Sequence, residues 1–400
     1  MSSFPLDLST EILRRLAVKD VFRLRCVSKL WCSLIDTPCF RKLHVSLSPK
    51  SDPNLLAIFQ EDESNLIKFL DLEFPSLLFP RIIPNQPRDD TNSILGSCNG
   101  LVALCNEHRR DKSVVYGFGY DPTTADYKLL KSAHFFYKKL PKRAQKYYNL
   151  HLCRALYWKA EIYSLKTNSW REISGCPFNC GLGGFDDVAG ILAENALHWL
   201  TQKYKPKPVS LRIPRHQEIA GFDLVGEEFY SVPILECFYG AFSMTMAALD
   251  GHLSVAASYT NGCVDVWVME EYGVKESWNK TISMMQEEVP NHLIYSINDM
   301  EKFKVFPLAY SRGGDKLLVH RRGKIFWCDL KSEEAEFDDG EGVLVDGNVE
   351  ITTASLVSLE DYRSEIDGKT EQIVVEDDNS NNNEKRKISQ KEQEARSEDA

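Results

Sequence analysis

The sequence lacks an uninterrupted apolar run long enough to cross a lipid bilayer. Its most apolar long stretch, residues 239–259, is broken by Asp250, Gly251 and His252, whereas a membrane-spanning helix needs about 20 consecutive apolar residues. The N-terminus also lacks the basic region and continuous apolar core of a secretory signal. We therefore expect neither membrane insertion nor secretion.

The cysteine spacing of a disulfide scaffold is missing as well. The 11 cysteines are an odd number scattered singly over 400 residues, and several stand in apolar runs such as GLVALC. Such cysteines are typical of reduced thiols inside a cell. We expect a cytoplasmic or nuclear protein, in which the sequon at residues 279–281 carries no glycan.

An excess of positive charge, which a general nucleic-acid or anionic-membrane binder would need, is absent. The net charge is −10, which argues against such partners unless a local patch overrides it. The basic, aromatic segment 135–154 has the composition of a nucleic-acid patch. It also fits an exposed loop between strands or a docking site for a target protein.

Residue constellations for catalysis or metal binding are also lacking. No local signature of an activated nucleophile occurs. Cys176 and Cys180, with His151 and Cys153 nearby, fit no standard two-plus-two zinc spacing. The glycine-rich segment 181–187 lacks the strand and helix that a phosphate-binding loop requires. We expect no catalytic residue, no metal and no cofactor.

Short helical patterns fill residues 4–40. Apolar residues recur at helical spacing over residues 8–16, 18–26 and 28–35. Asp7 and Ser28 are suited to cap the first and third helices, and Pro38 ends the third and opens a last turn. So small a bundle cannot bury all of its apolar side chains, and the surplus predicts a binding partner.

From residue 54 onward the apolar pattern alternates with period two, which is typical of β-strands. Residues 54–60 and 66–72 flank a polar segment and predict a hairpin. Residues 74–90 are dotted with prolines and predict a linker. No long helical pattern interrupts the strands that follow, so an all-β domain is expected.

A unit of two strands joined by a polar turn recurs, and an aromatic residue opens its second strand. The aromatic positions are Trp170, Tyr230, Trp278 and Phe337, with spacings of 60, 48 and 59 residues. Repeats of this length are typical of four-stranded propeller blades. Residues 350–359 could complete a blade that begins near residues 54–72 and so close the ring.

The order of FP, EIL, RCVSKLW, LI and F over residues 4–40 resembles the F-box family along the whole segment. The resemblance implies binding to a Skp-type adaptor, which is itself attached to a cullin. Two positions depart from the family pattern, since Phe4 replaces a leucine and Ala17 replaces a proline. The residues implied at or behind the adaptor surface are Pro5, Leu8, Ile12, Leu13, Leu16, Val21, Val27, Lys29 and Trp31.

Seven ordered segments between residues 94 and 360, among them SCNGLVAL, YGFGYDPTTADYKLL and EIYSLKTNSWREI, look like the plant F-box-associated interaction domain. This kelch-like family has a branch with S-locus F-box and immune-regulatory members. The family usually has another strand pair between the first two of these segments, where this chain has only NEHRRDKSV. The resemblance therefore implies a propeller of about five to six irregular blades, one of them trimmed.

The last residues differ in kind from the rest of the chain. Residues 361–400 are polar, highly charged and almost free of aromatic side chains, so they are predicted to be disordered. The sequence thus predicts a small all-α F-box module at 1–45, a first β-hairpin and linker at 46–93, an all-β kelch-like propeller domain at 94–360 and a disordered acidic tail at 361–400.

These expectations combine into a hypothesis about function. The chain would be the substrate-recognition subunit of an SCF-type cullin-RING ubiquitin ligase, and would promote ubiquitination and proteasomal degradation of a protein target that the sequence does not identify. It would perform no chemistry itself. Two alternatives stay open: an enzyme built on a propeller, and an F-box scaffold that acts outside degradation.

Overall fold

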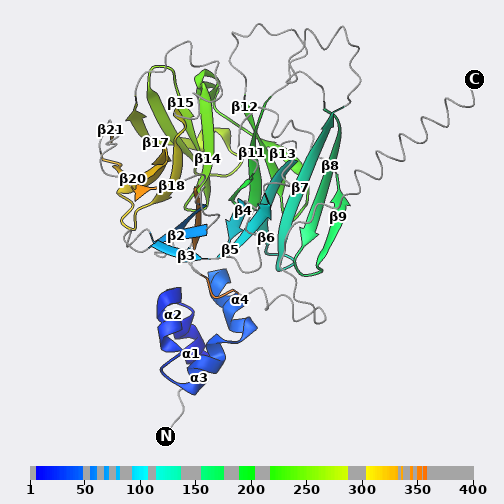
Figure 1. The fold of residues 1–400 in the computed structure, drawn as a ribbon, viewed down its shortest axis with the longest axis vertical. Coiled ribbons are helices and arrows are strands. Elements are labelled where there is room, and N and C mark those ends of the chain that lie inside the picture. The colour runs from blue at the N-terminus through cyan, green and yellow to red at the C-terminus, as the bar shows by residue number, and fades with distance from the viewer. Residues whose placement is uncertain are drawn as a thin grey trace, which may run out of the picture.

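The computed structural model has a helical lobe at one end and a ring of β-sheets at the other (Figure 1). The helices are α1 (Leu6–Leu13), α2 (Val18–Leu24), α3 (Lys29–Ile35) and α4 (Pro38–Leu47). The structure describes residues 6–47, 55–60, 67–71, 78–81, 92–106, 114–136, 155–174, 189–202, 217–286, 303–331, 335–336, 343–345, 349–353 and 355–357.

The ends of the helices are set by local capping. The Ser28 hydroxyl oxygen accepts the Trp31 backbone N–H at 3.1 Å, so the predicted cap of the third helix is confirmed. Asp7 lies inside the first turn of α1 rather than before it, so its predicted capping position is wrong. After Pro38 we expected a single turn, but α4 has 10 residues. The helix begins at Pro38 because the Thr37 hydroxyl accepts the Phe40 N–H and proline suits a first helical position.

Six sheets follow, and five of them have four or five strands. The first, in the order β23–β1–β2–β3, consists of β1 (Leu55–Gln60), β2 (Ile67–Asp71), β3 (Leu78–Arg81) and β23 (Val349–Thr353). The second is the pair β4 (Asn92–Cys98) and β5 (Leu101–Asn106). The third contains β6 (Val114–Asp121), β7 (Asp126–Phe136), β8 (Ala155–Ser164) and β9 (Ser169–Ile173).

The other three sheets continue in chain order. The fourth contains β10 (Ile191–Ala193), β11 (Ala196–Gln202), β12 (Gln217–Asp223) and β13 (Phe229–Val232). The fifth contains β14 (Ser243–Leu249), β15 (His252–Ser258), β16 (Cys263–Met269), β17 (Trp278–Met285) and the added strand β21 (Ala335–Glu336). The sixth contains β18 (Phe306–Tyr310), β19 (Lys316–Arg321), β20 (Lys324–Asp329) and β22 (Val343–Leu344). Two short 3₁₀ helices are η3 (Glu236–Gly240) and η4 (Lys275–Ser277).

The sheets form a closed ring. Their innermost strands meet in the order β23, β4, β6, β10, β14 and β18, and β18 returns to β23. The ring closes through β23, which pairs antiparallel with β1, for example at Leu55 and Thr353. The predicted closure of the first blade by a C-terminal strand is therefore confirmed, although the strand covers only Val349–Thr353.

Two features of the N-terminal β region refine the prediction. The hairpin of β1 and β2 is confirmed by their antiparallel pairing. The segment expected to be only a linker contains β3, so that part of the prediction is wrong. Pro80 is compatible with a strand here because β3 is the outer edge of its sheet, where a missing N–H donor is tolerated.

The trimmed blade is also present. The sheet of β4 and β5 has two strands among the described residues, at the position where the sequence lacks a strand pair. Its turn is made by Asn99 and Gly100, both with positive φ (50° and 79°), which suits a tight two-residue hairpin turn.

The recurring aromatic residues occupy equivalent places in the ring. Trp170, Tyr230 and Trp278 lie in β9, β13 and β17, which are the fourth strands of three successive sheets. Phe337 lies outside the described residues. The repeat in the sequence thus predicted the blade unit.

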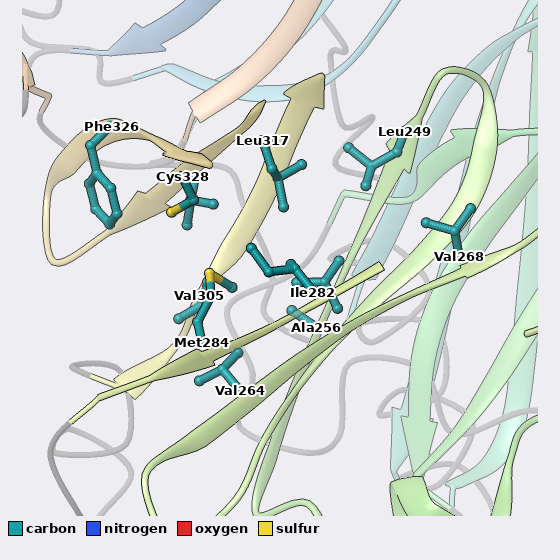
Figure 2. Close-up of a cluster of buried hydrophobic side chains, with 12 residues drawn as sticks. Leu249, Ala256, Val264, Val268, Ile282, Met284, Val305, Leu317, Phe326 and Cys328 are labelled. Atoms are coloured by element: carbon teal, nitrogen blue, oxygen red, sulfur yellow. The ribbon is translucent and has the colours of Figure 1, made fainter. Parts of the chain in front are cut away.

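Apolar clusters fill the space between neighbouring blades. Figure 2 shows one of them, in which side chains from β14–β17 and from β19–β20 point toward each other. Similar clusters join the second sheet to the third, the third to the fourth, the fourth to the fifth and the sixth to the first. A blade therefore buries its faces only against its neighbours, which is why closure by β23 matters for the whole ring.

Several predicted features lie outside the described residues: the tail 361–400, the four residues of the zinc alternative, the glycine-rich segment 181–187 and nearly all of the basic segment 135–154. Among the helices that the structure describes, none is long and apolar enough to span a membrane.

Candidate docking surface of the helical module

The helical module, residues 6–47, has a small core. Its fully buried apolar side chains are Leu13, Val18, Val21, Ile35 and Phe40, and Leu356 from the far end of the chain joins them. His44 is buried beside them, and its Nε2 lies 2.9 Å from the Leu16 carbonyl oxygen. Short helices gain little stability on their own, so this cluster holds the module together.

The surface of the module carries the apolar side chains that the core cannot accommodate. Six large apolar residues have 44% to 63% of their surface exposed: Leu6, Leu8, Ile12, Phe22, Val27 and Leu30. In the much longer remainder of the described chain, six other large apolar residues are exposed. Such a concentration on one small module is typical of a protein-binding surface.

The structure divides the nine residues predicted at the adaptor surface into three groups. Leu8, Ile12, Val27 and Lys29 are exposed. Leu13 and Val21 are core residues, whereas Leu16 and Trp31 are partly buried and pack against the core. Pro5 lies outside the described residues. The predicted role of these residues in binding stays a prediction.

Three exposed apolar residues, Leu6, Phe22 and Leu30, were absent from the predicted set. A signal for Phe22 was available, because it follows the core residue Val21 in a helix of 7 residues. Adjacent residues of a helix point in directions about 100° apart. Both side chains therefore could not face the same small core, and one of them had to be exposed.

Arginine side chains pair with two acidic residues of the module, Glu11 and Asp36. Glu11 binds Arg14 and Arg15, and Arg25 donates to the Asp36 carboxylate at 2.8 Å. Hydrogen bonds from Arg14 lower the pKa of Glu11, and the hydrogen bond from Arg25 lowers the pKa of Asp36. These acids therefore stay charged and paired with arginine, while Lys29 is exposed on the same module.

An apolar residue and a cation also meet on this surface. The Arg25 guanidinium lies 5.9 Å from the centre of the Phe22 ring. A cation over an aromatic ring attracts the ring weakly at an exposed site. The first 50 residues carry nine Lys or Arg against four Asp or Glu, an excess of +5. The surface thus combines apolar contact area with positive charge and suits a partner that has an apolar groove and acidic residues.

The propeller contrasts with this surface because it buries charged groups in a paired state. Lys128 in β7 donates to Asp121 at 2.8 Å, to Glu227 at 2.8 Å and to the Leu224 carbonyl oxygen at 2.7 Å. Glu227 also binds Arg171. Hydrogen bonds to Lys128 and Arg171 outweigh desolvation and lower the pKa of Glu227. The network joins the third blade to a turn of the fourth.

A buried histidine belongs to a second internal network. His198 Nδ1 lies 3.2 Å from the Ile191 carbonyl oxygen, and His198 Nε2 lies 2.6 Å from the Tyr272 hydroxyl. With Nδ1 donating to the carbonyl, Nε2 accepts from Tyr272, which in turn accepts from Tyr230. Burial lowers the pKa of His198 to about 4. The imidazole is therefore neutral and joins two blades.

In both networks the polar atoms bind one another. A catalytic group must instead present a proton or a lone pair to a substrate. Over the part of the chain that the structure describes, no three His, Cys, Asp or Glu side chains are grouped to hold a metal ion. The geometry of these two networks is that of internal braces.

The topology defines which end of the propeller lies away from the module. The chain enters β1 from the module, so β1 ends and β2 begins at the far end of the first sheet. The ends of β7 and β11 and the starts of β8 and β12 have the same place in their sheets. Figure 1 shows these ends of β7, β8, β11 and β12 on the side away from the helices.

Two family models match the sequence. Residues 1–43 match the F-box domain, and residues 92–336 match the F-box associated beta propeller domain. The second match covers more than half of the chain. The two matches confirm the resemblances that the motifs indicated.

Known plant proteins share both parts of the chain. F-box protein CPR1 of Arabidopsis thaliana is 26% identical over 383 residues, which cover 84% of this chain and 84% of CPR1. An F-box/kelch-repeat protein of the same plant is 26% identical over 319 residues, which cover 70% of this chain and 79% of that protein.

Among solved structures, a 6-phosphogluconolactonase of Bacteroides fragilis superposes with a TM-score of 0.32 at 11% identity, and the match covers 76% of this chain and 99% of that chain. The WD40 domain of SCAP from fission yeast gives a TM-score of 0.24 at 10% identity and covers 73% of this chain and 58% of that chain. Scores this low carry no argument about activity.

Proposed function

This chain belongs to the plant F-box proteins that carry an F-box associated beta propeller domain, and from that premise we propose that it is the substrate receptor of an SCF-type ubiquitin ligase. In this role the helical module binds a Skp-type adaptor and, through it, a cullin. The propeller binds a protein target, which is then ubiquitinated and degraded. Such a protein acts in the cytoplasm, the nucleus or both.

The observation that carries the proposal is the exposed apolar surface of the helical module. Leu8, Ile12 and Val27, which the sequence places in the adaptor set, are exposed on short helices whose core is already complete. Fully burying an exposed side chain of this kind contributes roughly 1.5–3 kcal/mol, and because these side chains are about half exposed, covering one of them on binding contributes roughly half of that. Exposure of these apolar side chains contributes no stability to a free monomer, so their exposure supports the existence of a permanent or recurrent binding partner.

The exposed residues are held in fixed relative positions. Leu8 and Ile12 are four residues apart on α1, which puts them on one face of the helix. Leu13, on the adjacent face, is fully buried in the module core. The same short helix therefore presents Ser9 and Leu13 to the core and an apolar pair, Leu8 and Ile12, to solvent, and we propose this exposed pair as the adaptor contact.

The contribution of the receptor to ubiquitination is proximity rather than chemistry. A target held by the propeller keeps its lysines at a high effective concentration near the activated ubiquitin. We propose the far end of the propeller as the target side, because the β7–β8 and β11–β12 strand ends lie there, away from the adaptor surface (Figure 1). On that side a bound target does not compete with the adaptor.

Co-purification with a purified Skp-type adaptor tests the first half of the proposal. We expect the full chain to retain the adaptor and a chain without residues 1–45 to lose it. If both chains retain the adaptor equally, or if neither does, the receptor assignment is wrong. The scaffold alternative is tested separately by the abundance of co-purifying targets, which rises on proteasome inhibition only if the receptor promotes degradation.

A further inference from the structure

The short segment that follows the closing strand of the propeller belongs to two cores at once. Leu356 has only 6% of its surface exposed and is buried among Leu13, Val21 and Phe40 in the core of the helical module. The next residue, Val357, packs against the propeller cluster that includes Leu95. Two successive side chains therefore bind the two parts of the molecule to each other.

Local backbone geometry directs these side chains apart. The Ser355 hydroxyl oxygen accepts the Val357 backbone N–H at 3.1 Å, and such a bond is typical of a serine-closed turn. The bond lies within residues 355–357, where Leu356 enters the module and Val357 packs on the propeller.

The second connection between the module and the propeller leaves from the same place. The chain runs from α4 into β1, and the first residue of β1, Leu55, is paired with Thr353 of β23. The covalent connection through residues 48–54 and the Leu356 contact thus both start from the β1–β23 strand pair. Two attachments that share one rigid base restrict rotation far more than a single linker does.

The share of Leu356 in the module core is large. Five other apolar residues of the cluster are buried, all from the helices. A core this small has few apolar neighbours, so each buried leucine matters more than it would in a large domain. Because Leu356 comes from the propeller side, the module core is complete only after β23 has closed the ring.

We propose that Leu356 is a positioning residue that locks the helical module in one orientation relative to the propeller. It thereby makes a fully formed module dependent on a closed propeller. The inference concerns orientation and does not use the adaptor, so it is independent of the proposed function. In an SCF receptor its consequence would be a fixed direction from the adaptor to the bound target.

Distance measurement between two spin labels tests the lock in the full chain. Cys39 in α4 and Cys237 in η3 are both exposed and provide one label on each side. Cys26, Cys32, Cys263 and the three cysteines outside the described residues are changed to serine. We expect a single narrow distance distribution for the wild-type residue at position 356 and a broad one for Leu356→Asp.

Three further variants separate positioning from general stability. Leu356→Met keeps an apolar anchor and should restore the narrow distribution. Leu344→Asp is the matched control, because Leu344 is a leucine of the propeller with 74% of its surface exposed, and it should leave the distribution narrow. Leu356→Ala replaces the aspartate variant if that variant fails to fold. We expect it to broaden the distance distribution while circular dichroism shows that the propeller is still folded.

A pair of truncations gives an independent answer. A chain that ends at residue 357 retains the anchor and should give the narrow distribution, whereas a chain that ends at residue 354 should give the broad one. The inference is overturned if folded Leu356→Asp or Leu356→Ala protein keeps the narrow distribution, or if the two truncated chains behave alike.

Discussion

The helical module and the propeller treat polar and apolar side chains in opposite ways. The module exposes apolar residues such as Ile12 and Val27 and pairs its charges at the surface, whereas the propeller buries its apolar faces between blades and also buries Lys128 and His198 in complete hydrogen-bond networks. An exposed apolar residue awaits a partner, and a buried paired charge needs none. The contrast supports the proposal that the adaptor binds the module, and it assigns internal bracing to the two networks of the propeller.

The largest expected effect tests the bracing side of this comparison. Lys128→Met leaves Asp121, which is 1% exposed, without its cation, and breaking a buried pair by removing one partner costs about 3–5 kcal/mol. We expect urea denaturation to show a loss of this size. Lys166→Met, at an exposed turn of the same blade, is the control and should change stability by less than about 0.5 kcal/mol. Equal effects of the two variants would show that the network is not a brace.

A pair of neighbours on α1 sharpens the comparison within the module. Leu13 is fully buried and Ile12 is 44% exposed. Truncating a buried leucine to alanine costs about 2–5 kcal/mol, so Leu13→Ala should destabilise the module in thermal denaturation. Ile12→Ala should leave the melting temperature nearly unchanged and weaken adaptor binding instead. If Ile12→Ala lowers the melting temperature as much as Leu13→Ala does, the assignment of Leu13 to the core and Ile12 to the binding surface is wrong.

A pH series probes the buried histidines of the propeller. Burial lowers the pKa of His320 from its usual 6.5 to about 4. Between these values the unfolded chain binds a proton that the folded protein excludes, so stability falls as the pH drops from about 6.5 toward 4. At pH 5 the loss from this residue is roughly 2 kcal/mol.

The variant His320→Leu isolates this contribution. Two other buried groups also change the stability with pH. The pKa of His198 is lowered to about 4, and desolvation raises the pKa of Glu350 to about 7, which changes the stability in the opposite direction. Both groups are present in the wild-type protein and in the variant, so their contributions cancel when the two are compared. Urea unfolding at pH 7.5 and pH 5 should therefore show a smaller acid loss in the variant, by roughly 2 kcal/mol. Identical losses would mean that His320 takes up its proton without unfolding.

The smallest effect concerns the turn between α1 and α2. Ala17 precedes α2 with φ of −61° and ψ of 148° and no side-chain cap, and its φ matches the value that proline imposes. Ala17→Pro should stabilise the module by about 0.4–1 kcal/mol by restricting the unfolded chain. Thermal denaturation measures the gain. A loss with proline would show that Leu16 cannot adopt the backbone conformation that a following proline requires.

Local signals in the sequence predicted much of the fold. The cap at Ser28, the recurring aromatic residues and the trimmed blade depend on turns and short-range periodicity, and all three are present. Even the pairing of β23 with β1 could be predicted, because a ring of blades leaves its first and last strands without other partners.

Burial within the module was harder to predict. Leu8, Ile12 and Leu13 have similar side chains at similar helical spacing, yet only Leu13 is in the core. The difference depends on how the short helices pack, and part of that core comes from Leu356, more than 300 residues away in the sequence. Strand β3 was missed because Pro80 signals a linker unless the strand is known to be at an edge.

The most direct test of the central claim is the affinity of the full chain for a purified Skp-type adaptor, measured by titration calorimetry for two matched variants. Ile12→Asp and Val225→Asp each place a charge on an apolar residue that is 44% exposed, the first on the module and the second on the propeller. We predict that Ile12→Asp weakens binding by about 30-fold or more, which corresponds to roughly 2 kcal/mol, and that Val225→Asp leaves it unchanged. Equal affinities for the two variants would contradict the assignment of the module surface as the adaptor site.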